Sequence, residues 1–310
     1  MQRIRFEDGV IYAFRPDLAP VKSVRSGETV EFVCEDACGG QIRSEKDTLA
    51  SLDFERVNGA TGPVAIRGSQ PGDALRVQIR DIRVADVGFQ SIAPKVGVLG
   101  ADVDGPATKM IPIRNGMAVF SRSIRLPIHP HVGTIGVAPA EKSWTTFYPG
   151  DHGGNLDTKE ISRGNAVYLP IFQPGAQLAM GDIHALMADG EVCVTGVEIA
   201  GTVRVRLDAV RGAALKRPIV ETRDAWIAVA SAPTLDEAAT IATRDGVELL
   251  VRGTGLAWKD AYMLASIACD LRISQDVDPW RTAKLVVPKS LLKRSPIRRA
   301  RAAREPAKPY

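Results

Sequence analysis

Alternating apolar and polar residues predict β-strands throughout the first part of the chain. The clearest run is ALRVQIRDIRV at 74–84, preceded by SQPGD, which has the composition of a tight turn. Leu75, Val77 and Ile79 alternate there with polar residues. The phase then slips by one residue at Ile82, and such a slip usually marks a β-bulge. We therefore expect a long strand that is entered through a turn and interrupted by a bulge.

Helical spacing replaces this alternation after Arg206. Thr234 and Glu237 have the spacing of a capping box, and Gly246 is predicted to end the helix that begins there. Apolar residues from Trp258 onwards recur at helical spacing, and we interpret them as core. The later stretches LRISQDVD and KLVVPKSLL are strand-like.

The predicted fold is mainly β, with sandwich-like or barrel-like sheets and a C-terminal α+β portion. We divide the chain into a β-rich domain at 1–220 that carries the candidate site, an α+β portion at 221–288, and a basic tail at 289–310. With 310 residues, 25% of them charged, the chain has the composition of a soluble globular protein that can bury a large core.

Cysteine usage and the absence of targeting signals favour a cytoplasmic location. The N-terminal sequence has no apolar run long enough for a signal peptide, and no stretch approaches the roughly 20 apolar residues of a membrane span. Cys34, Cys38, Cys193 and Cys269 do not have zinc-ribbon spacing, so we expect reduced thiols.

The net charge of +4 is concentrated in the tail. The stretch from Lys289 to Tyr310 has eight basic residues and one acid, so it carries +7 and leaves −3 for the remaining chain. Such a tail could contact nucleic acid, but it lacks interleaved aromatic residues. A solvated, poorly ordered segment, or one packed on another subunit, is the favoured interpretation, and nucleic acid is not expected as a partner.

All four histidines lie in one middle region, together with acidic residues and glycines. They are His129, His131, His152 and His184. In GGNLD, Asn155 and Asp157 are two residues apart, as are Asp182 and His184 later. A strand is predicted from Val192 to Ile199, which would place Glu198 as a carboxylate on a largely apolar face. A buried carboxylate is costly unless it is paired, protonated or bound to a metal.

The motifs of several other enzyme classes are missing from the sequence. It contains no P-loop, no Rossmann glycine pattern after a strand and no GxSxG elbow. Cys193 lies between valines in the predicted strand, which is a poor setting for a nucleophilic thiolate. These absences favour a metal-activated water over a covalent nucleophile.

Several long motifs closely resemble the acetamidase/formamidase family, in the family's order from about Ile11 to Leu292. They are DACGGQI from Asp36, NGATGPVAIRGSQPGDALRVQI from Asn58, HPHVGTIGVAP from His129, and GGNLDTKEISRGNAVYLPIFQPGAQLAMGDIHALMADGEVCVTGVE. Ala188 departs from the glycine that is usual in the family. The resemblance implies a mostly β hydrolase that releases ammonia from short aliphatic amides with the help of a divalent metal.

The expected mechanism is attack by a metal-activated water on a small amide substrate. The cofactor would be a divalent metal, zinc above all, with a second structural calcium as an option. Backbone N–H groups near Gly153 and Gly154 would stabilise the oxyanion, and His129 and Asn155 would orient the substrate. Glu198 would move the proton, with Glu191 in reserve. The expected metal ligands are Asp36, His131, Asp157 and His184.

Several interpretations stay open for the sequence alone. Asp36 could merely cap a turn, His131 and His129 could be core or ligand residues, and His152 could merely hydrogen-bond its loop. The alternative function is a non-catalytic β-domain that binds a small ligand and holds a structural calcium, although calcium rarely uses imidazole. A homo-oligomer with no membrane contact is expected in either case.

Overall fold

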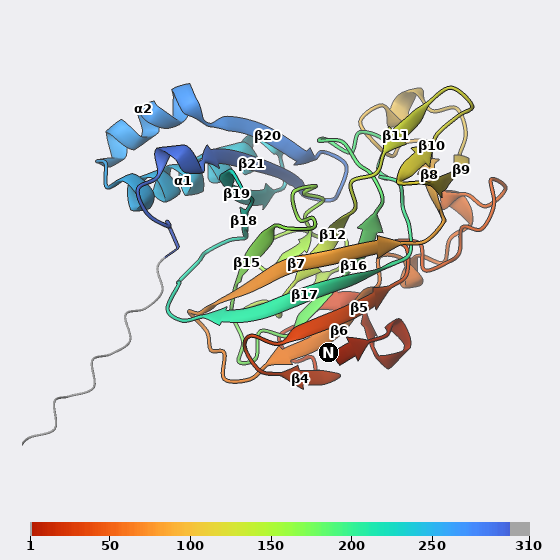
Figure 1. Cartoon of the computed structure of the whole chain (residues 1–310). Helices are drawn as coiled ribbons and strands as arrows, with labels where there is room; N and C mark the ends of the chain where they lie inside the picture. The colour runs from red at the N-terminus through yellow and green to blue at the C-terminus, as the bar shows by residue number, and fades with distance from the viewer. Residues whose placement is uncertain (1, 298–310) are drawn as a thin grey trace, which may run out of the picture.

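A computed structural model describes residues 2–297, in which two large β-sheets pack against each other (Figure 1). The apolar residues of both sheets form one buried cluster, so the two layers share a single core. The nine-stranded sheet has the order β1 (Gln2–Ile4), β5 (Thr29–Cys34), β17 (Gly201–Val210), β7 (Ala74–Val84), β15 (Ala166–Pro170), β18 (Ile219–Glu221), β19 (Ala225–Ala232), β21 (Arg281–Pro288) and β20 (Asp270–Gln275).

The second layer is a six-stranded sheet. Five of its strands form a continuous row, and the sixth, β4 (Lys22–Val24), pairs with β6. Its order is β14 (Gly153–Asn155), β12 (His131–Gly136), β16 (Leu178–His184), β6 (Ala60–Ile66) and β2 (Val10–Ile11). Every residue of β6, β12 and β16 is buried, which explains why their sequences do not alternate. Two smaller sheets comprise β11 (Arg125–Pro127), β10 (Met117–Val119), β9 (Ala107–Arg114) and β8 (Val87–Ile92), and β13 (Trp144–Thr145) with β3 (Ala13–Phe14).

The long strand predicted at 74–84 is confirmed as β7. Its pairing with β17 shifts register between Arg204 and Val205, opposite the predicted slip, and this is the expected bulge. Asp73 donates its backbone N–H to the Gln70 carbonyl at 3.0 Å, which closes the predicted turn. The mainly β fold with a C-terminal α+β portion is also confirmed.

Two helices, α1 (Leu235–Thr254) and α2 (Trp258–Ala268), lie against one side of the C-terminal strands (Figure 1). The capping box of Thr234 and Glu237 is present, but the prediction that Gly246 ends the helix is wrong. A Cβ at Gly246 would lie 2.4 Å from Leu285 Cδ2, so this glycine allows close packing on β21. The helix ends at Gly255, whose φ of 83° is the left-handed cap conformation.

The interpretation of α2 as core is correct only for its small residues. Ala261 and Ala265 are buried, whereas Trp258 and Tyr262 are 52% and 50% exposed. The helix packs on α1 through its alanine face, and the larger side chains at the same spacing point outward. Helical periodicity therefore located the element but not the face that it buries.

The strand predicted from Val192 to Ile199 does not form. This stretch is an irregular loop in which Glu191 and Val194 have φ values of 44° and 80°, conformations that a strand cannot accommodate. Two close backbone hydrogen bonds between Glu198 and Phe89 hold the end of the loop beside β8. The loop instead aims acidic side chains inward, as described below.

The nine-stranded sheet runs across the boundary expected near residue 220, because β18 to β21 continue it. Of the predicted basic tail, the part up to residue 297 packs on the chain itself: Leu291 and Leu292 lie against the α1–α2 core and Ile297 is buried. The rest of that tail lies outside the described residues. Among residues 2–297, no helix is both long and apolar enough to cross a membrane.

A fully buried lysine ties the C-terminal strands to the loops of the site. Lys284 on β21 has no exposed side-chain surface, and its Nζ lies 2.7 Å from Glu160 Oε2 and 2.6 Å from Asp189 Oδ1. Glu160 follows the GGNLD segment, and Asp189 precedes the loop of Glu191. A charge without surface access is retained only where it is paired.

Replacing Lys284 by methionine should therefore lower the free energy of unfolding. The substitution leaves Glu160 without its ion-pair partner, whereas Asp189 keeps its pair with Lys159 at 3.1 Å, and a cost of about 3 kcal/mol is expected. Urea denaturation would measure it, with Lys259→Met on the exposed side of α2 as the control, which should change stability by less than about 0.5 kcal/mol. Equal stability of Lys284→Met and the unsubstituted protein would show that the buried pair is not needed.

Candidate active site

His184, the last residue of β16, lies at the centre of a buried acidic cluster. Its side chain is 1% exposed, and its Nε2 is 3.2 Å from Asp182 Oδ1 and 3.1 Å from Glu198 Oε1. On the other side of the ring, Nδ1 is 3.1 Å from His131 Nε2. One imidazole thus joins residues from β16, β12 and the loop before β17.

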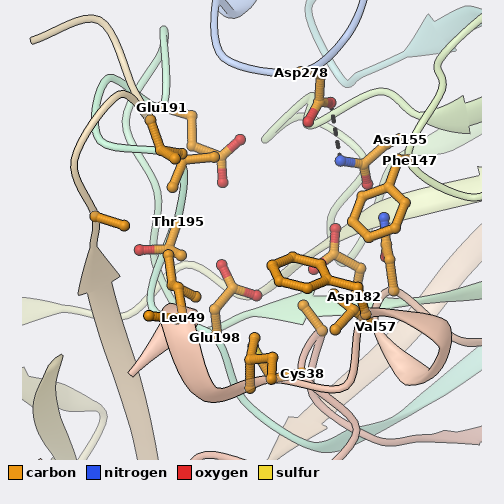
Figure 2. Close-up of a pocket in the computed structure, with 18 of the residues that line it drawn as sticks. Cys38, Leu49, Val57, Phe147, Asn155, Asp182, Glu191, Thr195, Glu198 and Asp278 are labelled. Atoms are coloured by element: carbon orange, nitrogen blue, oxygen red, sulfur yellow. Dashed lines mark hydrogen bonds between the residues drawn. The ribbon is translucent and has the colours of Figure 1, made fainter. Parts of the chain in front are cut away.

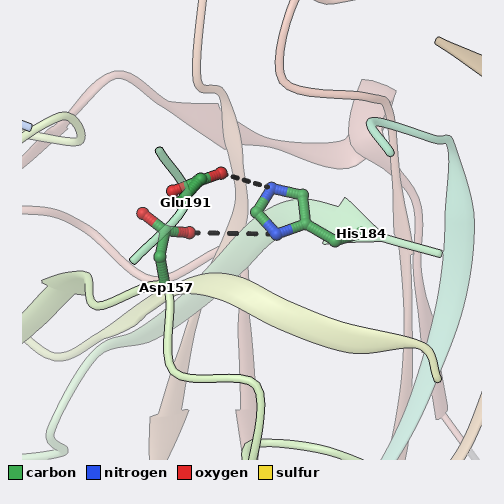
Figure 3. A group of neighbouring side chains, drawn as sticks. All are labelled: Asp157, His184 and Glu191. Atoms are coloured by element: carbon green, nitrogen blue, oxygen red, sulfur yellow. Dashed lines mark ion pairs between the residues drawn. The ribbon is translucent and has the colours of Figure 1, made fainter. Parts of the chain in front are cut away.

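Asp157 and Glu191 complete the cluster around the same ring (Figure 3). Asp157 Oδ1 lies 3.9 Å from His184 Nδ1, and Glu191 Oε1 lies 3.8 Å from His184 Nε2. Two groups could hold a metal ion: Asp157 with His184 and Glu191, and Asp182 with His184 and Glu198, each with ligand atoms within 4.8 Å of one another.

Glycines provide the space that this crowding requires. A Cβ at Gly133 would lie 2.5 Å from both Asp157 Oδ1 and Asp182 Oδ2, and one at Gly196 would lie 2.9 Å from His184 Cγ. The backbone of the acidic residues is unusual as well, since Asp157 and Asp182 have φ values of 42° and 55°. Sparsely populated backbone conformations of this kind concentrate at functional sites.

Burial of so many acids changes their protonation. Burial, with nearby negative charge, raises the pKa of Asp157 to about 7 and that of Glu198 to about 8. Burial and the charge of Asp157 also raise the pKa of Glu191 and of Asp278 well above the ordinary range. Without a cation, some of these groups must therefore carry a proton near neutral pH.

The surroundings of the two histidines shift their pKa values in opposite directions. Burial alone would lower the pKa of His184, but the charges of Glu198 and Asp182 outweigh it and hold that pKa well above its ordinary value. Burial and the charge of His184 lower the pKa of His131. His131 is thus a neutral partner that can accept the Nδ1–H of His184.

Unsatisfied oxygen atoms show that the residues present suit a cation. Both carboxylate oxygens of Asp157 and Oε2 of Glu198 are buried without a hydrogen-bond partner in the described part of the chain. Such atoms are rare in folded proteins and mark a missing proton, water or ion. Carboxylate oxygens and one imidazole, without thiolates, are a donor set that zinc and similar divalent ions accept.

The cluster opens into a cavity of about 390 Å³ (Figure 2). Its polar wall is formed by Asp182, His184, Glu191, Glu198, Asn155 and Asp278. The rest of the lining is largely apolar and comes from loops that are remote from one another in sequence. A reactive group and a binding space thus share one cavity.

Asp278 is the principal site residue that sequence reasoning missed. It lies in the connection between β20 and β21, is 7% exposed, and accepts a hydrogen bond of 2.9 Å from Asn155 Nδ2. A C-terminal segment therefore reaches the site of the β-rich part. The only local signal was an aspartate-rich turn, SQDVD, which is equally typical of an ordinary surface connection.

The structure brings some expected site residues together and separates others. Asp157, His184, His131, Glu191 and Glu198 form the cluster, and Asn155 lines the cavity. His129 is exposed. Asp36 has other partners, because its Oδ1 accepts the N–H groups of Cys38 and Gly40 at 2.9 and 3.2 Å, as in a turn cap. Gly154 is buried in β14.

His152 and Gly153 are used locally. The ring of His152 packs edge-on against Phe14 at 5.1 Å between centroids, and burial lowers its pKa to about 3, so it is neutral. The N–H of Gly153 donates to the Gly150 carbonyl at 3.1 Å, which engages one of the donors expected at an oxyanion.

Relatives of the chain include a formamidase of Methylophilus methylotrophus, 26% identical over 279 residues, and an acetamidase of Mycolicibacterium smegmatis, 24% identical over 265 residues. These matches cover 69% and 64% of this chain. They cover 69% and 65% of the two relatives. A further relative is a protein of Schizosaccharomyces pombe, and that match covers 62% of its length. The chain thus spans about two-thirds of their lengths.

Solved structures match over nearly the whole chain. An acetamidase from Bacillus halodurans is 41% identical with a TM-score of 0.88, covering 92% of this chain and 97% of its own. A predicted acetamidase/formamidase from Thermoanaerobacter tengcongensis is also 41% identical, with a TM-score of 0.92 and coverage of 96% and 98%. Residues 6–147 and 140–294 match the sequence model of one family, so the chain belongs to the acetamidase/formamidase family.

Proposed function

We propose that the protein is a hydrolase of short aliphatic amides, such as formamide and acetamide, which it converts to ammonia and a carboxylate with the help of a bound divalent cation. The observation that carries this proposal is Asp157, whose two buried oxygen atoms lack hydrogen-bond partners among residues 2–297. They lie beside His184 and Glu191, which themselves line the cavity. The names of the matched formamidase and acetamidase support the same reaction.

Asp157, His184 and Glu191 are the ligands that we assign to the cation. Glu191 takes the place of Asp36, whose carboxylate already accepts two turn N–H groups, and of His131, whose Nε2 faces His184. The expected ion is zinc, because the set combines imidazole with carboxylate oxygens. A cation bound there would polarise the amide carbonyl and favour ionisation of a nearby water.

Glu198 is the proton carrier of the proposed reaction. Its Oε1 accepts the Gly196 N–H at 2.8 Å and lies 3.1 Å from His184, which fixes the carboxyl group, while Oε2 has no partner in the described chain. Water adds to the carbonyl carbon and gives its proton to the ionised Glu198. The carbon–nitrogen bond then breaks, and Glu198 passes that proton to the departing nitrogen, which leaves as ammonia. Its pKa, raised by burial to about 8, suits this exchange near neutral pH.

We assign to Asn155 the orientation of the substrate. Its amide nitrogen is held by Asp278, and its side chain lines the cavity beside the acidic wall. A fixed side-chain amide can hydrogen-bond the substrate amide without the entropic cost of being ordered during the reaction. The structural calcium and the cytoplasmic location stay predictions.

A homo-oligomer formed by a second copy of the chain is part of the same proposal. Trp258, Tyr262, Met263 and Ile267 expose 50% to 84% of their surface on α2, a large apolar area for a free surface. Neighbouring β20 ends the nine-stranded sheet and exposes Leu271 by 51%. An antiparallel pair of two β20 strands centred on Leu271 would set Asp270 opposite Arg272 of the second copy, a complementary charge pattern.

Removal of the cation should abolish ammonia release, and a divalent ion should restore it. His184→Ala should lower bound metal per folded protein at least about tenfold and activity with it, because it removes a ligand. Elemental analysis measures the metal. The matched control is His152→Ala, a buried histidine outside the cluster, which should keep its metal. Full activity in metal-free protein would contradict the mechanism.

Glu198→Gln should separate proton transfer from metal binding. The amide keeps the shape but cannot exchange a proton, so kcat should fall by about 10² to 10⁴ while metal content and KM stay near their original values. Glu191→Gln should instead lose metal. Ammonia-release kinetics with elemental analysis decide, and an unchanged kcat in Glu198→Gln would assign that residue a structural role.

Ile267→Asp should shift the protein to a smaller species. A charge buried in an apolar contact lowers the association constant of the oligomer several-fold or more. Light scattering should therefore detect the monomer at concentrations where the unsubstituted protein is oligomeric. Lys259→Asp on the same helix is a control for added negative charge. An unsubstituted protein that is monomeric throughout would rule out this interface.

A further inference from the structure

The cavity has two chemically different halves (Figure 2). Glu191 and Asp278 lie at one end and Cys38, Leu49 and Val57 at the other, with Glu198 and Asp182 between them. Leu52, Ala93 and Pro94 add further apolar lining, and Phe147 lies beside Asn155. The small amides named above have almost no surface that an apolar wall could bury.

The size of the cavity also favours a ligand larger than formamide or acetamide. Its 390 Å³ lies within the roughly 300–1,000 Å³ that is typical of pockets for larger organic ligands. Acetamide has four non-hydrogen atoms and would fill on the order of 100 Å³ if each atom took about the volume of a liquid water. Formamide or acetamide at the acidic end would therefore leave most of the apolar half without a partner.

The apolar half is built from segments that converge only in the folded chain. Leu49 and Leu52 come from the 3-10 turn Leu49–Ser51 and its end, Val57 follows the 3-10 turn Phe54–Arg56, and Ala93 follows β8. Leu49 and Leu52 also pack against the core cluster of Cys38, Ile42 and Phe89, whereas Val57, 7% exposed, lines the cavity and belongs to none of the core clusters. Apolar surface that the core does not use is available to a ligand.

Cys38 contributes to this half as an apolar group. Burial raises the pKa of its thiol, so the thiol stays protonated. A protonated, buried cysteine packs as a small hydrophobic side chain and is not a nucleophile. The residues near the acidic end supply the reacting groups, and this half supplies binding.

We propose that the preferred substrates are primary amides with an apolar acyl group, an aliphatic chain of about four to six carbons or an arylalkyl group. The inference rests on the proposed function and refines its substrate class. The amide group lies at the acidic end beside Glu191 and Glu198. The acyl group extends toward Leu49 and Val57. Because the departing ammonia is small, the acyl side is the one that needs the apolar space.

A series of amides tests this assignment. Ammonia release from formamide, acetamide, butyramide, hexanamide and phenylacetamide would be compared as kcat/KM with the metal-loaded full chain. Each added methylene that enters the apolar half should raise kcat/KM about threefold to fourfold until the space is filled. A maximum at formamide or acetamide would overturn the inference while leaving amide hydrolysis intact.

A matched pair of variants locates the effect. Val57→Thr keeps the shape but adds a hydroxyl to the apolar wall, so it should lower kcat/KM for hexanamide about tenfold and kcat/KM for acetamide by a clearly smaller factor. Val21→Thr at an exposed position should change neither. Equal losses for both substrates in Val57→Thr would overturn the assignment of this wall. Preference for N-alkyl acetamides over the primary amides would place the apolar group on nitrogen and overturn it as well.

Discussion

The structure depends on the burial of charge around a single imidazole. His184 is 1% exposed and is surrounded by carboxylates that burial makes difficult to ionise. Two of its neighbours, Asp182 and Glu198, are close enough to stabilise a protonated ring, while Asp157 keeps two oxygen atoms without partners among residues 2–297. Such a cluster is stable only with a proton or a cation to offset the negative charge, and the same requirement makes it suitable for metal-assisted chemistry.

The fold keeps this cluster rigid by supplying its histidines from two neighbouring strands of the six-stranded sheet and most of its acids from loops. Strands β12 and β16 carry His131 and His184 in direct register. The glycines at 133 and 196 let acids and the imidazole approach where any Cβ would collide. The connection between β20 and β21 adds Asp278, and Lys284 on β21 holds the loops that carry the acids. The C-terminal α+β portion is thus a structural part of the site and not an appendage.

The two halves of the cavity explain how one site can combine reactivity with selection. In the proposed hydrolysis, water is the second reactant and is needed at the acidic end. Apolar loops near Leu49 and Ala93 limit it elsewhere, which lowers the local dielectric and strengthens the charges that remain. A calcium-binding module without catalysis would have little use for the buried imidazole at the centre of the cluster, because calcium prefers oxygen ligands.

The sequence by itself determined the β-rich class, β7 with its bulge, the capped start of α1, and the grouping of Asp157, His184, Glu191 and Glu198 in one region. These follow from local periodicity and from residue types close in the chain. Only the tertiary structure decided that residues 192–199 form a loop, that Gly246 lies inside a helix, and that Asp36 caps a turn. It alone also brought Asp278 and the apolar loops to the cavity. The physical reason is that alternation and propensity describe near neighbours, whereas close approach, unsatisfied burial and the lining of a cavity arise between segments that meet only when the chain has folded.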